Sequence, residues 1–509
     1  MIQRTDVAPE ASVSPGRVRI TDITDDSRTV LPGALFIARP GVRTDGARYI
    51  TEAVANGAAA VLVPDAALAS EVGAHVAVLT APDVALAGAI LAERFFGNPS
   101  SALGVMAVTG TNGKTTVAHA VWRLCNAARL RCGLVGTVFT DDGSTRAPSV
   151  LTTPPATELS FTLSAMVEAG CRAAAIEASS HALDQGRVAA IDTDVAVFTN
   201  LTGDHLDYHH TMDAYASAKA RLFEPLRAGA LAIVNVDDPA HECMLRDCRA
   251  EVLRCSLIDP SLDAFARITS TNIDGMHTAF AGPWGEFEVT LPVIGAYNAM
   301  NALQAIAAAH RLGVPGDRLR DAASLIEPPP GRLEPVPGPA TTSDDHPRVF
   351  VDFAHTDAAL RHALAAARTI VPEGCRLIVV FGCGGDRDAT KRPRMARGAA
   401  DLADVVVITS DNPRTEEPHR IITDILAGLS ASERDAAIVH ADRSRAIAEA
   451  VALAGPHDVV VIAGKGHERE QILPDGAGGV RRIPFDDAHH AVEALAARRP
   501  SNLQPAGPR

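Results

Sequence analysis

The alternation of short apolar runs with longer alanine-rich stretches restricts the fold of this sequence more than any other feature. Residues 104–109, 173–177, 194–199 and 230–235 have the length and composition of buried strands, and helical stretches lie between them. Parallel strands need a crossover connection, usually a right-handed one through a helix. The pattern therefore predicts an α/β protein built on a mostly parallel central sheet.

The alternation restarts beyond a stretch that is dense in proline. Residues 327–339 contain six prolines, and neither a helix nor a central strand tolerates that density. We therefore predict a stiff hinge there. The runs 349–353, 377–381, 405–409 and 459–463 follow it and predict a second parallel sheet of the Rossmann-like kind.

Turn-forming residues at Gly97–Ser101 mark an earlier and weaker break. A length of 509 residues suggests about three domains at roughly 150 residues each. We predict an N-terminal α/β unit at residues 1–100, a central ATPase-like domain with a phosphate loop at 101–332, and a C-terminal domain at 333–509.

Composition excludes several classes of protein. The net charge of −14 argues against a general nucleic-acid binder, which needs basic side chains to neutralise phosphates. Eight cysteines without a regular framework indicate reduced thiols in the cytoplasm, and the gaps between Cys243, Cys248 and Cys255 do not match zinc knuckles. The start of the chain lacks the apolar core of a signal peptide, and no run of about 18 apolar residues could span a membrane. We expect a soluble cytoplasmic protein.

The segment Val105–Thr116 runs from a predicted strand through a glycine-rich turn into a predicted helix. Backbone N–H groups in such a turn can surround phosphate oxygens. Lys114 would neutralise phosphate charge, and the hydroxyl of Thr115 would bind Mg²⁺. The spacing departs from the usual phosphate loop because Val108 occupies the place of its first glycine. We predict a nucleotide-binding loop; the alternative is an ordinary glycine-rich turn.

Polar residues also follow the next predicted strands. Glu177 stands where a second Mg²⁺ ligand would lie; the alternative is a helix N-cap or a surface charge. His205 and His209 have the spacing of a zinc pair but lack an evident third ligand, so His205 is a candidate metal ligand or phosphate contact. Lys219, on a predicted helix, would by itself be interpreted as a surface lysine. Asn298, with Asn301 on the same helix face, is a candidate ligand contact or an exposed residue.

Several motifs occur together in the order that is typical of the Mur ligases, the ATP-dependent amide-forming ligases of peptidoglycan precursor assembly. They are Thr109–Thr116, Glu177–His181, Asp204–Asp207, Asn298 with Asn301, Gly331-Arg332 and Asp352–His355. The resemblance covers the whole chain. It is strongest to the members that add the third peptide residue. It implies that the chain joins meso-diaminopimelate to UDP-N-acetylmuramoyl-L-alanyl-D-glutamate through an acyl phosphate, with the N-terminal domain binding the UDP-sugar peptide.

The resemblance also implies site residues. ATP contacts would come from Gly110, Thr111, Asn112, Gly113, Lys114, Thr115, Thr116, Asn298, Arg332 and Asp352. Mg²⁺ ligands would be Thr115, Glu177, His205 and Lys219, the last as an N6-carboxylysine, and Lys114, Glu177, His205 and Lys219 would be the catalytic set. Contacts to the UDP substrate would come from Ser27, Thr152, Thr153, Ser179, Gln185 and Arg187. The small-molecule substrates imply no nucleic-acid partner and no membrane insertion, and we expect a monomer.

The amino-acid site implied by the resemblance lies in the C-terminal domain. Its residues are Arg387, Asp411, Asn412, Pro413, Arg414, Gly464 and Glu468. Arg387 and Arg414 suit bidentate carboxylate recognition, and Glu468 suits an ammonium. Lysine lacks the distal carboxylate of diaminopimelate, so it would leave a buried arginine unpaired. The alternative for Asp411–Arg414 is a simple turn after a strand.

Four positions depart from the family pattern. Phe353 and Asp357 stand where tyrosine and proline are usual, Thr44 replaces a usual histidine, and Tyr297 stands where phenylalanine is common. These departures leave room for a paralogue that acts on another acceptor. A related ligase such as a folylpolyglutamate synthetase is the enzymatic alternative. A phosphate-loop NTPase switch without a ligation product is the alternative from another class.

Overall fold

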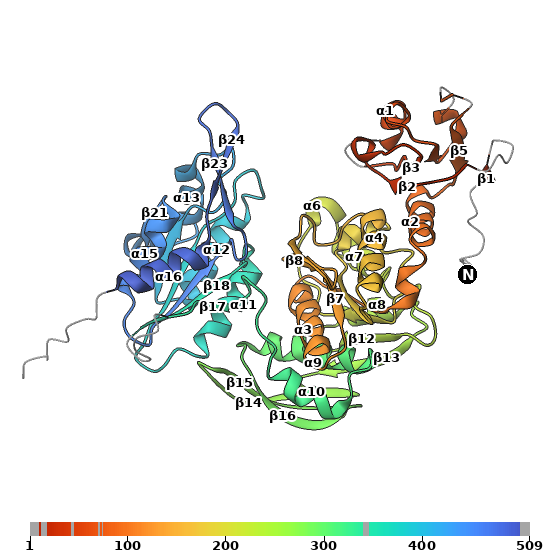
Figure 1. The fold of residues 1–509 in the computed structure, drawn as a ribbon. Coiled ribbons are helices and arrows are strands. Elements are labelled where there is room, and N and C mark those ends of the chain that lie inside the picture. The colour runs from red at the N-terminus through yellow and green to blue at the C-terminus, as the bar shows by residue number, and fades with distance from the viewer. Residues whose placement is uncertain are drawn as a thin grey trace, which may run out of the picture. The chain divides into compact units, whose positions relative to one another are not determined.

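The computed structural model describes residues 10–11, 18–41, 45–69, 72–73, 75–338 and 346–498 (Figure 1). The chain separates into two compact units, each described here by itself. The first comprises Met1–Ala266, Phe280–Phe287 and Met300–Ala323, and the second comprises Arg267–Ala279, Glu288–Ala299 and Ser324–Arg509. Thr44, one of the departures from the family pattern, lies outside the described residues.

The first unit begins with a five-stranded sheet. Its strands, in spatial order, are β1 (Glu10–Ala11), β5 (Ala77–Thr80), β4 (Ala60–Val63), β3 (Ala34–Ile37) and β2 (Asp22–Thr24). Only β1 is antiparallel to its neighbour. β3 and β4 are buried along their whole length, as continuous apolar runs in a parallel sheet must be. The helices are α1 (Ile50–Ala55) and α2 (Val84–Phe95), with 3-10 turns at Ser27–Thr29, Gly46–Tyr49 and Ala66–Ala69.

The central sheet has eleven strands. Its seven-stranded parallel part is, in spatial order, β14 (Ala264–Asn272), β13 (Glu251–Ser256), β12 (Leu231–Asn235), β11 (Val195–Phe198), β6 (Gly104–Thr109), β10 (Ala173–Glu177) and β7 (Cys132–Val135). β8 (Phe139–Asp141) and β9 (Arg146–Pro148) extend the end at β7, and β15 (Gly275–Gly282) and β16 (Gly285–Leu291) extend the end at β14. The register pairs Val108 with Glu177 and Thr109 with Phe198, so three strands end together beside the phosphate loop.

Short connections and longer helices link these strands. The helices are α3 (Lys114–Ala127), α4 (Ala156–Glu168), α5 (Ser180–Asp184), α6 (Leu206–His209), α7 (Met212–Ala220), α8 (His241–Leu245), α9 (Ala296–Arg311) and α10 (Gly316–Ala323). The strands predicted at 104–109 and 173–177 are confirmed residue for residue, and those at 194–199 and 230–235 to within one residue at an end.

The predicted break at Gly97–Ser101 is a firmly held connection. Residues Pro99–Ala102 form a 3-10 turn. The buried carboxylate of Glu93, near the end of α2, accepts hydrogen bonds from the hydroxyls of Ser100 (2.7 Å) and Ser160 (3.0 Å). The hydroxyl of Ser100 in turn accepts a hydrogen bond from the backbone N–H of Asp192 (3.0 Å). These contacts join α2 to the central sheet region within the first unit.

The second unit contains a six-stranded sheet. In spatial order its strands are β17 (Glu334–Pro335), β18 (Arg348–Asp352), β22 (Val459–Ala463), β19 (Leu377–Phe381), β20 (Val405–Thr409) and β21 (Ile438–His440). All pairs are parallel except β17 with β18. The helices are α11 (Asp357–Arg368), α12 (Lys391–Leu402), α13 (Pro418–Leu426), α14 (Ala431–Ala436), α15 (Arg443–Leu453) and α16 (Asp487–Ala497), and β23 (Glu470–Pro474) with β24 (Val480–Pro484) forms a separate hairpin. The predicted α/β class with three sheet-containing regions is confirmed.

The proline-rich stretch is bound to the second unit over much of its length. Glu334–Pro335 pairs with β18 at the sheet edge, where a strand can accommodate proline. The backbone N–H of Leu333 donates to Asp352 (2.7 Å), and that of Phe353 donates to the carbonyl of Gly331 (2.8 Å). Whether this stretch acts as a hinge stays a prediction.

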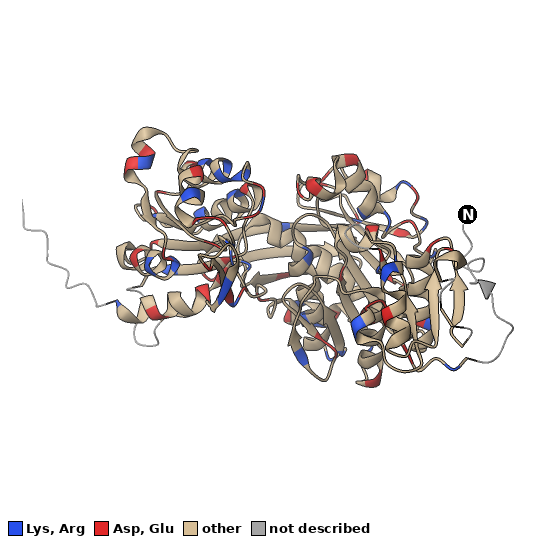
Figure 2. Ribbon diagram, turned by 90° about the horizontal axis from the view of Figure 1, so that it is seen from above, with Lys and Arg blue, Asp and Glu red and all other residues tan. Residues whose placement is uncertain are grey.

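Basic and acidic residues are interspersed along the elements of each unit (Figure 2). Among the helices in the described part of the chain, none has the length and apolar character that a membrane span requires.

Candidate active site

The phosphate loop lies between β6 and α3, as predicted, and is stabilised by its own lysine. Gly110 and Gly113 have φ values of +151° and +85°, which suit glycine. The ammonium of Lys114 donates to the carbonyl oxygens of Gly110 and Thr111, both at 2.9 Å. These contacts close the loop around the lysine and place a positive charge at the start of α3.

Hydrogen bonds to Asn200 also hold the phosphate loop in place. Thr111 N donates to the carbonyl of Asn200 (2.8 Å), and Asn112 N donates to the side-chain oxygen of Asn200 (3.0 Å). A Cβ built on Gly113 would lie 2.6 Å from Oδ1 of Asn301, so the loop and this asparagine are adjacent. Asn200 follows β11, so neighbouring strand ends together hold the loop.

Glu177 is buried at the end of β10, and both of its carboxylate oxygens accept hydrogen bonds. Oε2 accepts from the hydroxyls of Thr115 (2.9 Å) and Thr137 (3.0 Å), and Oε1 accepts from Thr137 N (2.6 Å). A hydroxyl that donates its proton to a carboxylate keeps its lone pairs for a cation. Thr115 and Glu177 thus form a pair of oxygen ligands of the kind that Mg²⁺ prefers.

Lys219 is buried on α7 beneath the same loop. Its Nζ donates to the carbonyl of Gly110 (2.7 Å) and lies 4.2 Å from the ring centroid of Tyr215. Burial, assisted by the charge of Lys114, lowers the pKa of Lys219 well below its ordinary value. The expectation of a surface lysine, drawn from the residue by itself, is wrong, because α7 packs this face against the phosphate loop.

His205 lies in the same region, with φ +54° and its ring edge-to-face with that of His181 at 4.9 Å. Burial lowers the pKa of His205, and Lys114 and Lys219 act in the same direction against Asp204. A neutral imidazole is the form that binds a metal. Within the described residues, no group of three or more His, Cys, Asp or Glu side chains is arranged to hold a metal ion. The predicted Mg²⁺ ligands are not such a group, because they include one threonine and one lysine.

Most of the residues predicted to contact the UDP substrate form one cluster beside Glu177. Thr153 Oγ1 donates to the carbonyl of Glu177 (2.6 Å) and accepts from Ser179 N (3.1 Å). Arg187 donates to the carbonyl of Thr153 (2.6 Å) and to the side-chain oxygen of Gln185 (2.7 Å). Thr152 joins the cluster through Thr137, whose hydroxyl lies 3.1 Å from its own.

Ser27, the remaining residue of that predicted set, belongs to the N-terminal sheet region. Its hydroxyl donates to Glu52 (2.7 Å), and its side chain is buried. The charges of Asp25 and Arg39, which belong to this region, act on Arg187 in the cluster. The pKa of Arg187 is lowered, first by its burial and second by the positive charge of Arg39. An anionic ligand between two guanidinium groups would relieve that repulsion.

In the second unit, Arg332 and Asp352 lie together at the end of β18. Asp352 accepts hydrogen bonds from Leu333 N (2.7 Å) and Ala354 N (2.8 Å), and burial raises its pKa to about 6 in spite of Arg332. The guanidinium of Arg332 lies over the ring of Phe353, 5.0 Å from its centroid. Asn298, also in this unit, is buried and donates to the carbonyl of Ile294 (2.8 Å).

Two of the described departures from the family pattern, Phe353 and Asp357, have simple physical roles. Phe353 packs its ring against Arg332 and against His467, at 5.1 Å between ring centroids, and neither contact needs the hydroxyl of a tyrosine. Asp357 is the first residue of α11, after the N-cap Thr356. Proline and aspartate both suit that position, one through its fixed φ and the other through its charge. Neither departure disturbs a predicted contact.

The residues predicted for the amino-acid site gather at the ends of β19, β20 and β22. Asp411, Asn412 and Pro413 are buried after β20, and Arg414 has φ +54°. Arg414 Nη1 donates to the carbonyl of Gly385 (2.8 Å), in the loop after β19 that carries Arg387. Positions 385 and 413 are in such close contact that a Cβ on Gly385 would clash with the carbonyl of Pro413.

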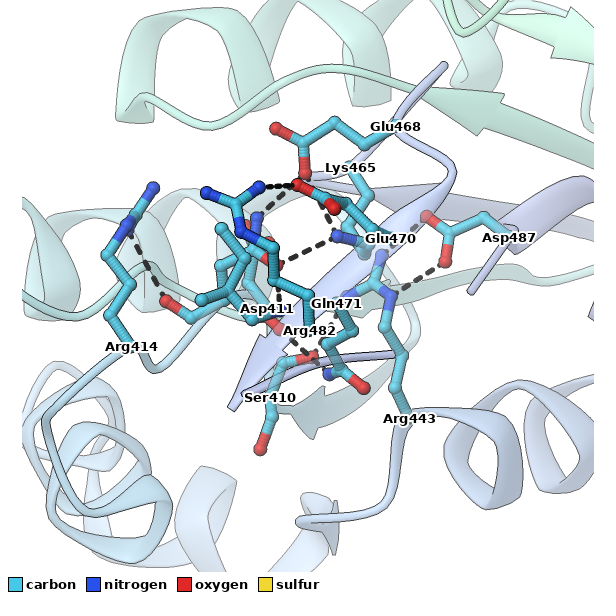
Figure 3. A network of polar contacts seen from close by, with 12 residues as sticks. Ser410, Asp411, Arg414, Arg443, Lys465, Glu468, Glu470, Gln471, Arg482 and Asp487 are labelled. Carbon is cyan, nitrogen blue, oxygen red and sulfur yellow. Dashed lines mark hydrogen bonds and ion pairs between the residues drawn. The ribbon is translucent and has the colours of Figure 1, made fainter. Parts of the chain in front are cut away.

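The loop after β22 supplies the rest of this site (Figure 3). Gly464 has φ +120°, and a Cβ there would lie 3.0 Å from Oδ2 of Asp411. Glu468 Oε2 accepts hydrogen bonds from Asn412 Nδ2 (2.7 Å) and Lys465 Nζ (2.9 Å). The carboxyl of Asp411 has a raised pKa, chiefly because of its burial. The three loops therefore form one polar surface at the carboxyl ends of parallel strands, where α/β sheets bind ligands.

Several residues that hold these sites were missed at the sequence level. Thr137 and Asn200 bind Glu177 and the phosphate loop, and the fully buried Arg443 and Asp487 form a two-bond ion pair, each bond 2.7 Å long. Arg443 also donates to the carbonyls of Ser410 and Ala463 at the ends of β20 and β22. Asn200 offered a signal, because it too is a polar residue directly after a buried strand.

Comparison with known proteins gives matches along most of the chain. Family models match at residues 19–96 (Mur ligase family, catalytic domain), 108–309 (Mur ligase middle domain) and 331–466 (Mur ligase, glutamate ligase domain). Two curated relatives carry the name UDP-N-acetylmuramoyl-L-alanyl-D-glutamate–2,6-diaminopimelate ligase. The protein from Synechococcus elongatus is 43% identical over 484 residues and that from Pseudomonas aeruginosa 42% over 487, each alignment covering 94% of this chain and 95% of the relative.

Solved structures agree with these matches. A structure of a UDP-N-acetylmuramoyl-L-alanyl-D-glutamate–2,6-diaminopimelate ligase has a TM-score of 0.67 and 34% identity, covering 94% of this chain and 95% of that one. A folylpolyglutamate synthase from Mycobacterium tuberculosis has a TM-score of 0.61 at 19% identity, covering 82% of this chain and 96% of that one, and so shares the fold. Together, the full-length relatives and the three consecutive family models show that the chain belongs to the Mur ligase family.

Proposed function

We propose that this chain joins meso-diaminopimelate to UDP-N-acetylmuramoyl-L-alanyl-D-glutamate and converts ATP to ADP and phosphate. As a Mur ligase it is an ATP-dependent, amide-forming ligase. The relatives that match it along nearly their whole length are named for this substrate pair. The product is the UDP-N-acetylmuramoyl tripeptide of peptidoglycan synthesis.

The reaction needs activation because a carboxylate is a poor electrophile. A carboxylate oxygen of the dipeptide attacks the γ-phosphorus of ATP and releases ADP, which gives an acyl phosphate. The amine of the third residue then attacks the carbonyl carbon, phosphate leaves, and the amine loses a proton. Catalysis of phosphoryl transfer consists mainly of positioning and charge stabilisation. Lys114 and the N–H groups of the loop supply donors at the start of α3.

We assign ATP and Mg²⁺ to this site. Bound Mg²⁺ neutralises charge on the transferring phosphoryl group. Thr115 and Glu177 would hold it, and His205 with a modified Lys219 would hold a second ion. We assign ATP contacts also to Asn298, Arg332 and Asp352. Contacts to the UDP substrate are assigned to Ser27 and to the cluster around Thr153 and Arg187.

Lys219 fits conversion to an N6-carboxylysine. Its lowered pKa supplies a neutral amine, which attacks CO₂ to form a carbamate and release one proton. The carbamate nitrogen keeps one N–H for the carbonyl of Gly110, which now accepts from Nζ at 2.7 Å. The new negative charge would face Lys114, whose positive charge now disfavours an ammonium at that position.

The observation that carries the choice of amino acid is the pair of arginines, Arg387 and Arg414, beside Gly384. A Cβ built on Gly384 would lie 3.0 Å from Arg414 Nη1 and 3.8 Å from Cγ of Arg387. Burial and then the charge of Arg387 lower the pKa of Arg414, so an anion is electrostatically favoured there. A distal carboxylate satisfies this site, and lysine offers none.

The remaining assignments concern the molecule as a whole. We place the reaction in the cytoplasm and propose that the chain acts as a monomer. The domain boundaries that we propose stay at residues 100 and 332, with the N-terminal domain binding the UDP-sugar peptide.

The direct test is ADP release measured with each substrate omitted in turn. We expect stoichiometric ADP and tripeptide only when ATP, the UDP dipeptide and diaminopimelate are all present. Steady ADP release without either acceptor would indicate an NTPase switch. Release with glutamate and a folate in place of these acceptors would indicate the folylpolyglutamate alternative.

A further inference from the structure

Lysine is rare in this chain, and every lysine lies at a polar site. Only four of the 47 basic residues are lysines: Lys114, Lys219, Lys391 and Lys465. None of them is exposed, and each Nζ donates to an oxygen of the protein. In a chain that otherwise uses arginine, a buried lysine marks a position that fits a compact ammonium and not a planar guanidinium. The mechanism above gives no role to Lys465.

Lys465 is fully buried in the loop after β22, and its ammonium joins two residues of the amino-acid site (Figure 3). Nζ donates to Oδ1 of Asn412 (3.0 Å) and to Oε2 of Glu468 (2.9 Å). Asn412 closes the triangle, since its Nδ2 donates to the same Oε2 (2.7 Å). Two donors therefore hold one oxygen of Glu468 on the protein side.

The other oxygen of this carboxylate is left for a ligand. Among the described residues, none donates a hydrogen bond to Oε1 of Glu468, and the side chain is 34% exposed. Oδ1 of Asn412 is occupied, because it accepts from Lys465 and also from Ile472 N (3.0 Å). The triangle thus fixes which edge of Glu468 faces outward.

We propose that Lys465 is a positioning residue for the third substrate, holding Glu468 and Asn412 so that Oε1 of Glu468 receives the ammonium of the amino acid. The inference rests on the proposed function, in which Glu468 binds that ammonium. Lys465 itself, without exposed surface, acts through its two partners.

Charge makes the proposal testable by pH. Burial raises the pKa of Glu468, but Lys465 and the hydrogen bonds hold it below its ordinary value. The other charged or titratable groups that act on Glu468 are His467 on its own loop, Asp411 and Arg414 after β20, and Arg443 on α15. All of these remain when Lys465 is replaced, so a difference between the two pH profiles reports the loss of the ammonium.

The test compares K465M with wild type and with R482M. Arg482 pairs with Glu470 on the β23–β24 hairpin, drawn in the same view, and does not contact the triangle. We expect K465M to raise KM for diaminopimelate by about ten- to a hundredfold, the scale of one charge-assisted contact. The acidic limb of kcat/KM for diaminopimelate should move to higher pH, because Glu468 then protonates more easily. KM for ATP should stay unchanged, and R482M should behave as wild type.

A double variant separates positioning from a general loss of structure. In an E468Q background, replacing Lys465 by Met should have little further effect on KM for diaminopimelate, because the partner charge is already gone. This double variant also removes the carboxylate that K465M leaves without its partner, so it serves if K465M folds poorly. Unchanged KM and an unchanged acidic limb in K465M would overturn the proposal. A wild-type enzyme that uses another amino acid would instead overturn the proposed substrate, and the same comparison is then made with that amino acid.

Discussion

Single residues at strand ends define where the chemistry can occur, and they differ in how far sequence reveals them. The positions of Lys114 at the phosphate loop and of Glu177 at the neighbouring strand end could be predicted, because each stands in a polar motif directly after a buried strand. Lys219 could not be predicted from its own surroundings in sequence, since alanine and serine flank it on an ordinary helix. Its burial results from packing of α7 beneath the phosphate loop, which is a long-range contact across 109 positions.

Lys114 should be essential to turnover. Lys114→Ala removes the charge nearest the loop and also the two hydrogen bonds that close it. We expect a loss of at least about a hundredfold in kcat, the scale found for removal of one electrostatic stabiliser. Steady-state ADP release measures this, with circular dichroism to confirm folding. Near-normal turnover in a folded variant would contradict the assignment of the loop.

Lys219 should be carbamylated by CO₂, and turnover should depend on this modification. Lys219→Ala should be nearly inactive, and short carboxylic acids that enter the vacated space should partly restore turnover. Intact-protein mass spectrometry under CO₂ and native pH checks the modification. Full activity with an unmodified ammonium would exclude the carbamate. Acid should also inactivate the wild type reversibly, because carbamates lose CO₂ on protonation.

Arg414 should determine the choice of amino acid. Arg414→Ala should raise KM for diaminopimelate by about ten- to a hundredfold, since a charge-assisted pair contributes about 1.5–3 kcal/mol. KM for ATP should change little. Arg414→Lys should not restore the wild-type value, because a point charge cannot reproduce a bidentate contact. If the wild type used lysine and diaminopimelate equally well, residues 411–414 would be only a turn.

At the scale of elements, strands with continuous apolar sequences could be predicted well, whereas the partly exposed strands next to them could not. The strands at 104–109, 377–381, 405–409 and 459–463 agree with β6, β19, β20 and β22 because a strand buried on both faces needs an unbroken apolar run. The partly exposed β14 and β16 carry no such run, and they were not predicted. Their pairing depends on neighbouring strands, which sequence alone does not place.

The turn between β6 and α3 gives a prediction at this scale. Gly113 and Gly97 have nearly equal φ values, +85° and +82°, but only Gly113 has a neighbour within reach of a Cβ, Oδ1 of Asn301 at 2.6 Å. Either substitution by alanine should destabilise the protein by about 1–2 kcal/mol through backbone strain. Only Gly113→Ala should also raise KM for ATP, because the loop must shift. Thermal unfolding and steady-state kinetics measure the two effects, and equal kinetics for both variants would show that the loop tolerates the shift.

At the scale of the whole molecule, motif order along the sequence was informative because each parallel sheet presents its strand ends at one edge. Polar residues far apart in sequence therefore meet, as Thr115 meets Glu177 in the first unit and Asn412 meets Glu468 in the second. The pairing partners within each site, such as Thr137 and Arg443, depend on the detailed course of loops and could not be assigned beforehand. The residue types and the parallel direction of the strands could be predicted, whereas the individual contacts depend on packing.

The location of the two polar sites in different units predicts that the reaction can be divided into two halves. In the proposed reaction, activation would depend on the phosphate loop with Glu177, whereas Arg414 and Glu468 would serve the incoming amine. Hydroxylamine is a small nucleophile that can replace that amine and trap an acyl phosphate as a hydroxamate. With ATP and the UDP dipeptide, Arg414→Ala should therefore form hydroxamate at nearly the wild-type rate while making almost no tripeptide at low diaminopimelate concentration. Lys114→Ala should lose both products by at least about a hundredfold. If Arg414→Ala also failed to form hydroxamate, the guanidinium would be needed for activation itself, and its role could not be confined to choosing the amino acid.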